Sequence, residues 1–452
     1  MLQDKVMVLP EHFERYTRQL MGDDRYERYL HSFEQEPPVS IRLNPLKLND
    51  GEWQVKDGEA VPWCRHAYYL PRRPNFTFDP LLHAGCYYVQ EAASMFLDTV
   101  LCQTLDFALT SPQSIVHSSQ STVHSSQSTV HSSQSTVHSP QVLDLCAAPG
   151  GKATLLRTAL PAGTVLYVNE PVRQRAAVLS ENICKWGWPD CIVTNAYPRD
   201  YLRSGLTFDI ILCDVPCSGE GMFRKDEATI REWSPQNVEK CWRQQRDILR
   251  DAWSCLRAGG LLVYSTCTFN TMENEENVRW ACQELCAEVL PVSTLPEWNI
   301  TGSLLPGFDA PVYRFIPGIT RSEGLFVCVL RKVSGDGCLV TGEGRVYPAH
   351  KSADKHRLLH PSPFTPHHPL HPSPDTLHQA PLTYSQAMSY LRGEALVLPA
   401  DTLRGIVAVT FMGHTLGLAK NIGTRANNLY PKEWRIKTTH IPNDYEAILV
   451  NT

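Results

Sequence analysis

Hydrophobic positions in the middle of the chain fall into two kinds of segment. Short apolar runs at 141–146, 164–169, 208–215, 261–265 and 325–330 have the length and composition of buried strands. Between them, apolar residues near helical spacing mark 152–160, 173–186 and 236–257, and Gly259 with Gly260 is expected to cap the last helix. Strands alternating with helices of these lengths predict an α/β fold with a doubly wound, Rossmann-like parallel sheet.

Two segments break this alternation. Residues 111–140 repeat the heptad VHSSQST from Val116, Val123 and Val130. One apolar residue in seven is too few for a coiled-coil seam, so we interpret the repeat as a disordered insertion without a catalytic role. Residues 353–381 are rich in proline and histidine, which favours a flexible linker, with metal binding by the histidines as the alternative.

These breaks divide the 452 residues into five parts. We expect an N-terminal α+β region that binds RNA ahead of the catalytic domain, the repeat insertion, the catalytic sheet, a connecting region that contains the linker, and a smaller β-rich C-terminal domain. Their predicted bounds are 1–108, 109–140, 141–333, 334–381 and 382–452.

Composition is that of a globular protein, with 42% hydrophobic and 20% charged residues. The fifteen cysteines are odd in number and lack the spacing of a disulfide framework or a zinc site. We therefore expect reduced thiols, no bound metal and a cytoplasmic protein. The first residues lack the pattern of a signal peptide, and no apolar run is long enough to cross a membrane.

Net charge alone argues mildly against a nucleic-acid partner, because it is −5. The distribution of charge is more informative. Residues 417–437 hold five basic side chains against one acidic residue, Glu433, and a looser basic group contains Arg65, Arg72 and Arg73. For charge runs alone a solvated surface is the favoured interpretation, and contact with phosphates is the alternative.

Polar and reactive residues follow four of the predicted strands. The loop 146–152 follows the first, Glu170 the second, Asp214 closes the third, and Cys267 closes the fourth. Parallel sheets bind ligands beyond the carboxyl ends of their strands, so these four groups are expected on one rim of the sheet.

The loop and Glu170 indicate a cofactor that carries a ribose. Gly150 and Gly151 permit a close approach of backbone to ligand, and Glu170, 20 residues beyond Gly150, is placed to accept hydrogen bonds from ribose hydroxyls. Neither the GxGxxG pattern nor a phosphate loop is present. The pattern favours S-adenosylmethionine and leaves a dinucleotide-dependent dehydrogenase as the alternative.

Cys267 and Asp214 fit methylation at carbon 5 of cytosine. That carbon is a poor nucleophile until a thiolate adds to carbon 6, and a carboxyl group can support ring nitrogen 3 during the addition. A buried, inert thiol is the usual interpretation of an isolated cysteine. At a strand end beside the Asp-Val-Pro-Cys segment 214–217, we instead interpret Cys267 as the nucleophile.

The segments LDLCAAPGGK, ILCDVPCSGEGMFRKD and YSTCTFNTMENEENV closely resemble motifs of the Nol1/Nop2/Sun family of RNA 5-methylcytosine methyltransferases. SIRLNPLK and GCYYVQEAASM are similar to the region before the catalytic domain, and RSEGLFVCVLRK and GLAKNIGTRANNLYPKEWRIK to the bacterial RsmF-type branch. The resemblance implies an RNA substrate, in this branch small-subunit ribosomal RNA or the small subunit itself, and a C-terminal PUA-like module in a monomeric protein.

The resemblance also implies residue roles. Cys267 would be the nucleophile, Cys217 would assist product release, and Asp214 would contact both cytosine and cofactor. The cofactor would further contact Cys146, Ala147, Ala148, Pro149, Gly150, Gly151, Lys152, Glu170 and Asn195. RNA would contact Arg42, Asn44, Lys420, Arg425, Lys432 and Arg435. Tyr197 departs from the family, which often has Asp there near the adenine. A catalytically silent RNA-binding or ribosome-assembly factor and a transfer-RNA substrate are the alternatives.

Overall fold

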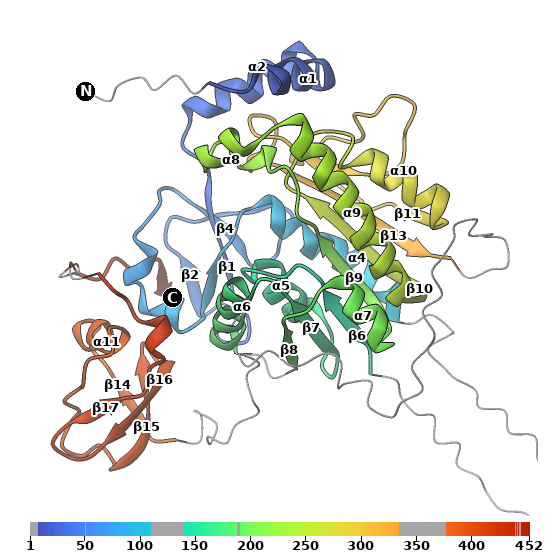
Figure 1. Cartoon of the computed structure of the whole chain (residues 1–452). Coiled ribbons are helices and arrows are strands. Elements are labelled where there is room, and N and C mark those ends of the chain that lie inside the picture. The colour runs from blue at the N-terminus through green and yellow to red at the C-terminus, as the bar shows by residue number, and fades with distance from the viewer. Residues whose placement is uncertain are drawn as a thin grey trace, which may run out of the picture.

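The computed structural model describes residues 8–49, 51–109, 139–187, 190–333 and 377–452, apart from 439, 441 and 443. Nearly all of the VHSSQST repeat and of the His/Pro-rich segment lies outside these ranges, so the interpretations of both remain predictions. Figure 1 shows a central sheet layered with helices, an N-terminal region in blue and a C-terminal domain in red. None of the described helices is both long enough and apolar enough to cross a bilayer.

The N-terminal region combines the helices α1 to α4 with a four-stranded antiparallel sheet in the order β3-β4-β1-β5. The first helix buries Phe13, Thr17 and Met21, which recur every four residues and so share one face. The elements are α1 (Glu11–Met21), α2 (Asp23–His31), β1 (Val39–Leu43), β2 (Trp53–Val55), β3 (Glu59–Ala60), β4 (Ala67–Leu70), α3 (Pro80–His83), β5 (Tyr87–Val89) and α4 (Leu97–Leu109).

The central sheet has the order β11-β13-β10-β9-β6-β7-β8, with β12 paired to β13. The strands from β10 to β8 in this order run parallel. The strands are β6 (Gln141–Asp144), β7 (Val165–Asn169), β8 (Cys191–Thr194), β9 (Phe208–Asp214), β10 (Leu256–Thr266), β11 (Ala287–Leu290), β12 (Tyr313–Phe315) and β13 (Leu325–Lys332). The predicted Rossmann-like α/β fold is thereby confirmed.

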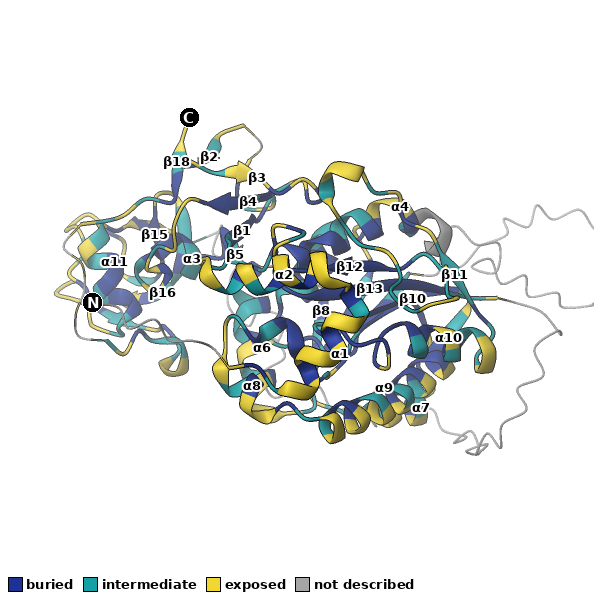
Figure 2. Cartoon of the chain, turned by 90° about the horizontal axis from the view of Figure 1, so that it is seen from above, coloured by how far each residue is buried: buried dark blue, intermediate teal, exposed yellow. Residues whose placement is uncertain are grey.

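Helices cover both faces of this sheet, which makes it doubly wound. Successive strand residues point to opposite faces, so Val142 packs in one core with α4, α5 and α6 while Leu143 packs in the other with α7, α9 and α10. Figure 2 shows the strands dark blue between helices whose outer faces are yellow. The helices are α5 (Gly151–Ala159), α6 (Arg173–Trp186), α7 (Pro198–Ser204), α8 (Glu227–Glu232), α9 (Pro235–Cys255) and α10 (Glu275–Glu284).

Two local expectations are corrected. The sheet is not wholly parallel, because β13 runs antiparallel to both β10 and β11. An apolar run looks the same in either direction, so its pattern carries no information on strand polarity. The glycines Gly259 and Gly260 do not cap α9, which ends at Cys255; they lie inside β10, where the register with β9 shifts.

The C-terminal domain contains a four-stranded sheet in the order β14-β15-β16-β17 and one helix. The last strand of the domain, β18, lies outside that sheet and pairs with β2 of the N-terminal region. Buried residues of both regions form one apolar cluster, so the two regions share a core. The elements are β14 (Gln379–Pro381), α11 (Tyr384–Leu391), β15 (Gly405–Phe411), β16 (His414–Asn421), β17 (Ala426–Asn428) and β18 (Leu449–Asn451).

Candidate active site

The glycine-rich loop turns from β6 directly into α5. Gly150 has φ +119°, a left-handed conformation that strains any residue with a side chain, and it immediately precedes the helix. The hydroxyl of Thr154 donates to the Gly150 carbonyl at 2.8 Å. The backbone N–H of Ala147 donates to Asn169 at the end of β7, which joins the loop to the next strand.

Arg42 holds this loop region through hydrogen bonds, and neither Arg42 nor Asn44 faces solvent. Arg42 is buried, and its guanidinium donates to Thr154 Oγ1 at 2.6 Å and to the Gly151 carbonyl at 3.2 Å. Burial lowers its pKa to about 10. Asn44 is also buried and donates to the backbone carbonyls of Gly85 and Trp186. Their predicted contact with RNA is therefore wrong, because neither side chain is accessible.

Glu170 lies just beyond β7 with its carboxylate almost fully buried. One oxygen accepts the Val172 N–H at 2.9 Å, and the other lies 3.3 Å from Arg175. Arg175 also donates to the Ala148 carbonyl, so it bridges Glu170 to the glycine-rich loop. Each carboxylate oxygen has two acceptor sites, which leaves Glu170 with capacity for ribose hydroxyls.

Asn195 and Tyr197 lie after β8, next to Glu170. The Asn195 amide donates to the backbone carbonyl of Glu170 at 2.6 Å, while the residue itself is exposed. Tyr197 is 58% exposed and occupies the N-cap of α7, where Asp200 accepts from its backbone N–H. The predicted adenine contact of either residue remains a prediction.

Asp214 ends β9 and lies between Lys152 and Ser265. Its oxygens accept from Lys152 Nζ at 2.9 Å and from Ser265 Oγ at 2.7 Å. Burial alone would lower the pKa of Lys152, but the carboxylates of Asp214 and Asp144 outweigh it and raise that pKa. Lys152 therefore remains a cation at neutral pH. Asp144, fully buried at the end of β6, has a pKa raised to about 8 by burial and by the charge of Asp214.

The two cysteines singled out from the sequence lie side by side. The Sγ atoms of Cys217 and Cys267 are 3.1 Å apart, and the Cys267 N–H also points to Cys217 Sγ at 3.3 Å. The hydrogen bond with Cys267 and burial raise the pKa of the Cys217 thiol well above its ordinary value. Cys267 lies close enough to Lys152 for the charges of the two groups to interact, so a thiolate at Cys267 would have a cation nearby. Cys267 itself is partly accessible.

A buried polar network that the sequence did not reveal connects the two thiol loops. Glu220 accepts from the backbone N–H groups of Phe269 and Asn270, at 2.7 and 2.9 Å, and from the Trp233 indole. Glu273 accepts from the Ser218 N–H at 3.0 Å and from the Asn270 amide at 2.8 Å. Burial raises the pKa of Glu273 to about 7.

Part of the predicted RNA contacts lies on the surface of the C-terminal domain. Lys420, Arg425 and Lys432 are exposed on or near β16 and β17. Arg435 is half-buried against Gly393 and donates weakly to the Tyr430 carbonyl, which gives it a packing role. Within the described part of the chain, no three His, Cys, Asp or Glu side chains are grouped to bind a metal ion.

Known proteins match the chain along most of its length. A family model for the N-terminal domain of 16S rRNA methyltransferase RsmF matches residues 9–92, one for 16S rRNA methyltransferase RsmB/F matches 134–331, and one for the methyltransferase RsmF PUA domain matches 378–436. These three matches follow one another in a single order of domains.

The chain belongs to the RsmB/F methyltransferase family. The resemblance to the RsmF-type branch and the C-terminal PUA domain are thereby confirmed. So is S-adenosylmethionine as the cofactor of this class of methyltransferase. The residues of the rim suit that cofactor, since Glu170, a buried carboxylate beyond β7, keeps acceptor capacity for a ribose.

Curated relatives are named ribosomal RNA small subunit methyltransferase F. The Enterobacter protein is 26% identical, and the match covers 96% of this chain and 97% of that relative. The Klebsiella pneumoniae protein is 27% identical, and the match covers 87% of this chain and 89% of that relative. The match to the Erwinia tasmaniensis protein is 29% identical and spans 72% of this chain but 64% of that relative.

Solved structures support the fold of this RsmB/F family member. A methyltransferase homologue from Pyrococcus horikoshii is 24% identical, covers 72% of this chain and 96% of its own, and has a TM-score of 0.55. NSun6 from the same organism is 19% identical, and the match covers 73% of this chain and 100% of that structure's chain, with a TM-score of 0.54.

Proposed function

We propose that this methyltransferase transfers a methyl group to carbon 5 of a cytosine in small-subunit ribosomal RNA through a covalent adduct with Cys267. The 3.1 Å separation of the Cys267 and Cys217 sulfur atoms, beside the Lys152–Asp214 pair, is the observation that carries the proposal. The curated relatives' shared name supports ribosomal RNA of the small subunit as the substrate.

The first step is attack by Cys267. Its thiolate adds to carbon 6 of a cytosine that has left its stack. Asp214 is held by Lys152 and Ser265, so its oxygens are positioned to accept from the amino group of the ring and from the N–H that forms when nitrogen 3 takes up a proton from solvent during the attack. Electron density displaced by the new carbon–sulfur bond makes carbon 5 nucleophilic.

Methyl transfer and release complete the reaction. When bound, S-adenosylmethionine supplies an electrophilic methyl group to carbon 5. A base then removes the proton from carbon 5, the carbon–sulfur bond breaks, and Cys267 leaves as a thiolate. Cys217 retains its proton because of its raised pKa, and it can donate a hydrogen bond to the departing sulfur.

The remaining regions would hold the RNA. Lys420, Arg425 and Lys432 of the PUA domain are exposed cations suited to phosphates. We place the protein in the cytoplasm, where ribosomal RNA would be its partner, and treat it as a monomer with the five parts outlined from the sequence.

Two cysteine variants test the chemistry. Cys267→Ala should abolish transfer of labelled methyl groups to ribosomal RNA, while S-adenosylmethionine binding stays unchanged. Cys217→Ala should accumulate a protein–RNA adduct that survives a denaturing gel. Cys102→Ala, which removes an exposed thiol from α4, is the matched control and should behave as wild type. Methyl transfer by Cys267→Ala would refute the nucleophile assignment.

A further inference from the structure

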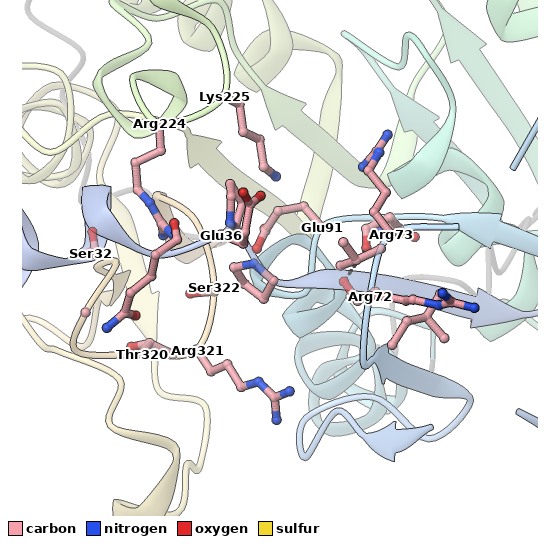
Figure 3. A pocket seen from close by; sticks show the side chains of 18 of the residues that line it. Ser32, Glu36, Arg72, Arg73, Glu91, Arg224, Lys225, Thr320, Arg321 and Ser322 are labelled. Carbon is pink, nitrogen blue, oxygen red and sulfur yellow. Dashed lines mark hydrogen bonds between the residues drawn. The ribbon is translucent and has the colours of Figure 1, made fainter. Parts of the chain in front are cut away.

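A cavity of about 1200 Å³ lies between the N-terminal region and the catalytic domain. The N-terminal wall comprises 35–40, 70–73 and 89–91, and the catalytic-domain wall comprises Arg224, Lys225 and 318–322 (Figure 3). We call this cavity the interdomain cleft. None of the residues proposed for catalysis or cofactor binding lines it.

The interdomain cleft adjoins the active site on its catalytic-domain side. Gly221, three residues before Arg224, donates its N–H to the Cys267 carbonyl at 2.8 Å. A Cβ at Gly221 would lie only 2.7 Å from the Cα of Gly324, two residues beyond the cleft residue Ser322. One segment of this wall therefore contacts the backbone of the nucleophile, and the other packs against that segment.

The N-terminal side of the cleft adjoins the cofactor loop. The cleft residue Gln90 accepts from Arg42 Nε at 2.9 Å, and Arg42 in turn donates to the Gly151 carbonyl. A strand of substrate lying in the cleft would thus have the nucleophile's loop on one side and the cofactor loop on the other.

The charge in the cleft is mainly positive. Its lining contains five basic residues, Arg72, Arg73, Arg224, Lys225 and Arg321, and two acidic residues, Glu36 and Glu91. Three of the basic residues form ion pairs: Arg72 with Glu446, Arg224 with Glu323, and Arg321 with Glu59.

Arg73 and Lys225 differ from the other three. Both are exposed, and neither lies within ion-pair distance of a carboxylate in the described ranges. Arg73 comes from the N-terminal wall and Lys225 from the catalytic-domain wall, as Figure 3 shows. The Arg73 guanidinium lies 5.6 Å from the centroid of the Phe76 ring, which leaves its charge unneutralised. Two cations on opposite walls, without a carboxylate partner among the described residues, suit a ligand with repeated negative charges.

We propose that the interdomain cleft binds the RNA strand next to the target cytosine, with Arg73 and Lys225 contacting phosphates from opposite walls. This inference rests on the proposed function and deepens it by naming where the strand lies. Such contacts fix the register of the strand, and the cytosine can then reach Cys267 by rotating out of its stack. Arg73 and Lys225 are positioning residues because they do not touch the reacting atoms.

The salt dependence of RNA binding tests this assignment. The probe is a fluorescein-labelled, single-stranded RNA of twelve nucleotides with mixed sequence, titrated with the full-length protein between 50 and 300 mM KCl. Each phosphate contact to a single strand contributes about 0.7 to the slope of log K against log salt. The double variant Arg73→Gln/Lys225→Gln should lower that slope by about 1.4 and weaken binding about tenfold at 50 mM salt.

The matched control removes two cations outside the cleft. Lys240→Gln/Arg279→Gln changes exposed side chains on α9 and α10 and should leave both slope and affinity unchanged. S-adenosylmethionine affinity should be the same in all three proteins, which also verifies that each is folded. An unchanged slope in the cleft variant, or an equal loss in the control, would overturn the proposal.

The two proposals fail in different ways. Methyl transfer that depends on Cys267, together with an unchanged slope in the cleft variant, would refute the cleft and leave the function intact. A wild-type protein that transfers no methyl to any RNA, together with the expected loss of slope, would refute the function and retain the cleft as an RNA site.

Discussion

The two sides of the active-site rim are held in place by different parts of the molecule. On the thiol side, the loops that carry Cys217 and Cys267 are joined by Glu220 and Glu273, which belong to the same domain. On the cofactor side, the loop 146–151 is held by Arg42, which comes from the N-terminal sheet.

This difference separates two functions that meet at one site. The geometry of the nucleophile depends on acceptors inside the catalytic domain, whereas the cofactor loop depends on a neighbouring region. We therefore expect changes on the thiol side to affect the rate of the chemical step, and changes at Arg42 to affect mainly the affinity for S-adenosylmethionine.

The largest effect is expected from Glu220→Gln. One carboxylate oxygen accepts from the N–H groups of Phe269 and Asn270, and the other from the Trp233 indole. An amide replaces one of these acceptors with a donor, so buried donors lose their partner at a cost of about 3 kcal/mol. The unfolding midpoint in urea should fall, and methyl transfer should slow about a hundredfold as the thiol loop shifts.

The control for this variant is Glu239→Gln, which removes an exposed carboxylate from an ion pair with Arg243 on α9. It should change stability by less than about 0.5 kcal/mol. Affinity for S-adenosylmethionine should stay within about twofold of wild type in both proteins. If Glu220→Gln lost as much affinity for S-adenosylmethionine as it lost in rate of methyl transfer, the distinction between the two sides would be wrong.

Arg42→Met should have the next largest effect, on the other side of the rim. The substitution keeps a long side chain but removes the donors to Gln90, Thr154 and the Gly151 carbonyl. We expect a loss of about 2 kcal/mol in stability and an S-adenosylmethionine Kd about tenfold higher, with kcat at saturating cofactor nearly unchanged.

Calorimetric titration with S-adenosylmethionine and steady-state methylation together check this outcome. Arg279→Met removes an exposed guanidinium from α10 and is the matched control. If Arg42→Met lowered kcat and left Kd unchanged, the N-terminal sheet would instead support the chemical step.

The positions of reactive groups at strand ends could be predicted from the sequence, whereas the contacts that hold them could not. Cys146, Glu170, Asp214 and Cys267 each follow a short apolar run, so local pattern alone places them on one rim. The prediction for Arg42 failed because its partner Thr154 is 112 residues away. A local pattern of apolar and polar residues carries no information on a hydrogen bond between residues so far apart in the sequence.

Glu220 and Glu273 were missed for a related reason. Charged residues are expected at the surface, and the stretch 270–277 reads as a polar loop. Its asparagines and glutamates are instead mostly buried and hydrogen-bonded inside the protein, as Asn270 is to Glu273 and Asn277 to Gln245. Their density within eight residues was the available signal, since so many acceptors and amides suit a closed polar network better than a solvated turn.

The smallest expected effect is a change in how stability depends on pH, and it compares the two sides directly. The pKa of Asp144, below the cofactor loop, is raised to about 8, and that of Glu273, on the thiol side, to about 7. The folded protein therefore holds protons that the unfolded chain has already released. The stabilisation from these two carboxyls is fully present below their unfolded pKa values near 4 and is lost as pH rises towards 8.

Above pH 7 Glu273 and buried thiols with raised pKa also contribute to the decline, so the share of Asp144 is isolated by comparing wild type with a variant that lacks this carboxyl. Asp144→Asn cannot ionise, and the free energy of unfolding should then fall less steeply in this window. The slope removed is at most about 1.4 kcal/mol per pH unit for one proton. Urea titrations of the cofactor-free protein at pH 6, 7, 8 and 8.5 measure it, with Asp247→Asn, at an exposed site on α9, as control. Equal slopes above pH 7 in Asp144→Asn and wild type would show that Asp144 is already ionised, and that the cofactor side stores no protonated carboxyl.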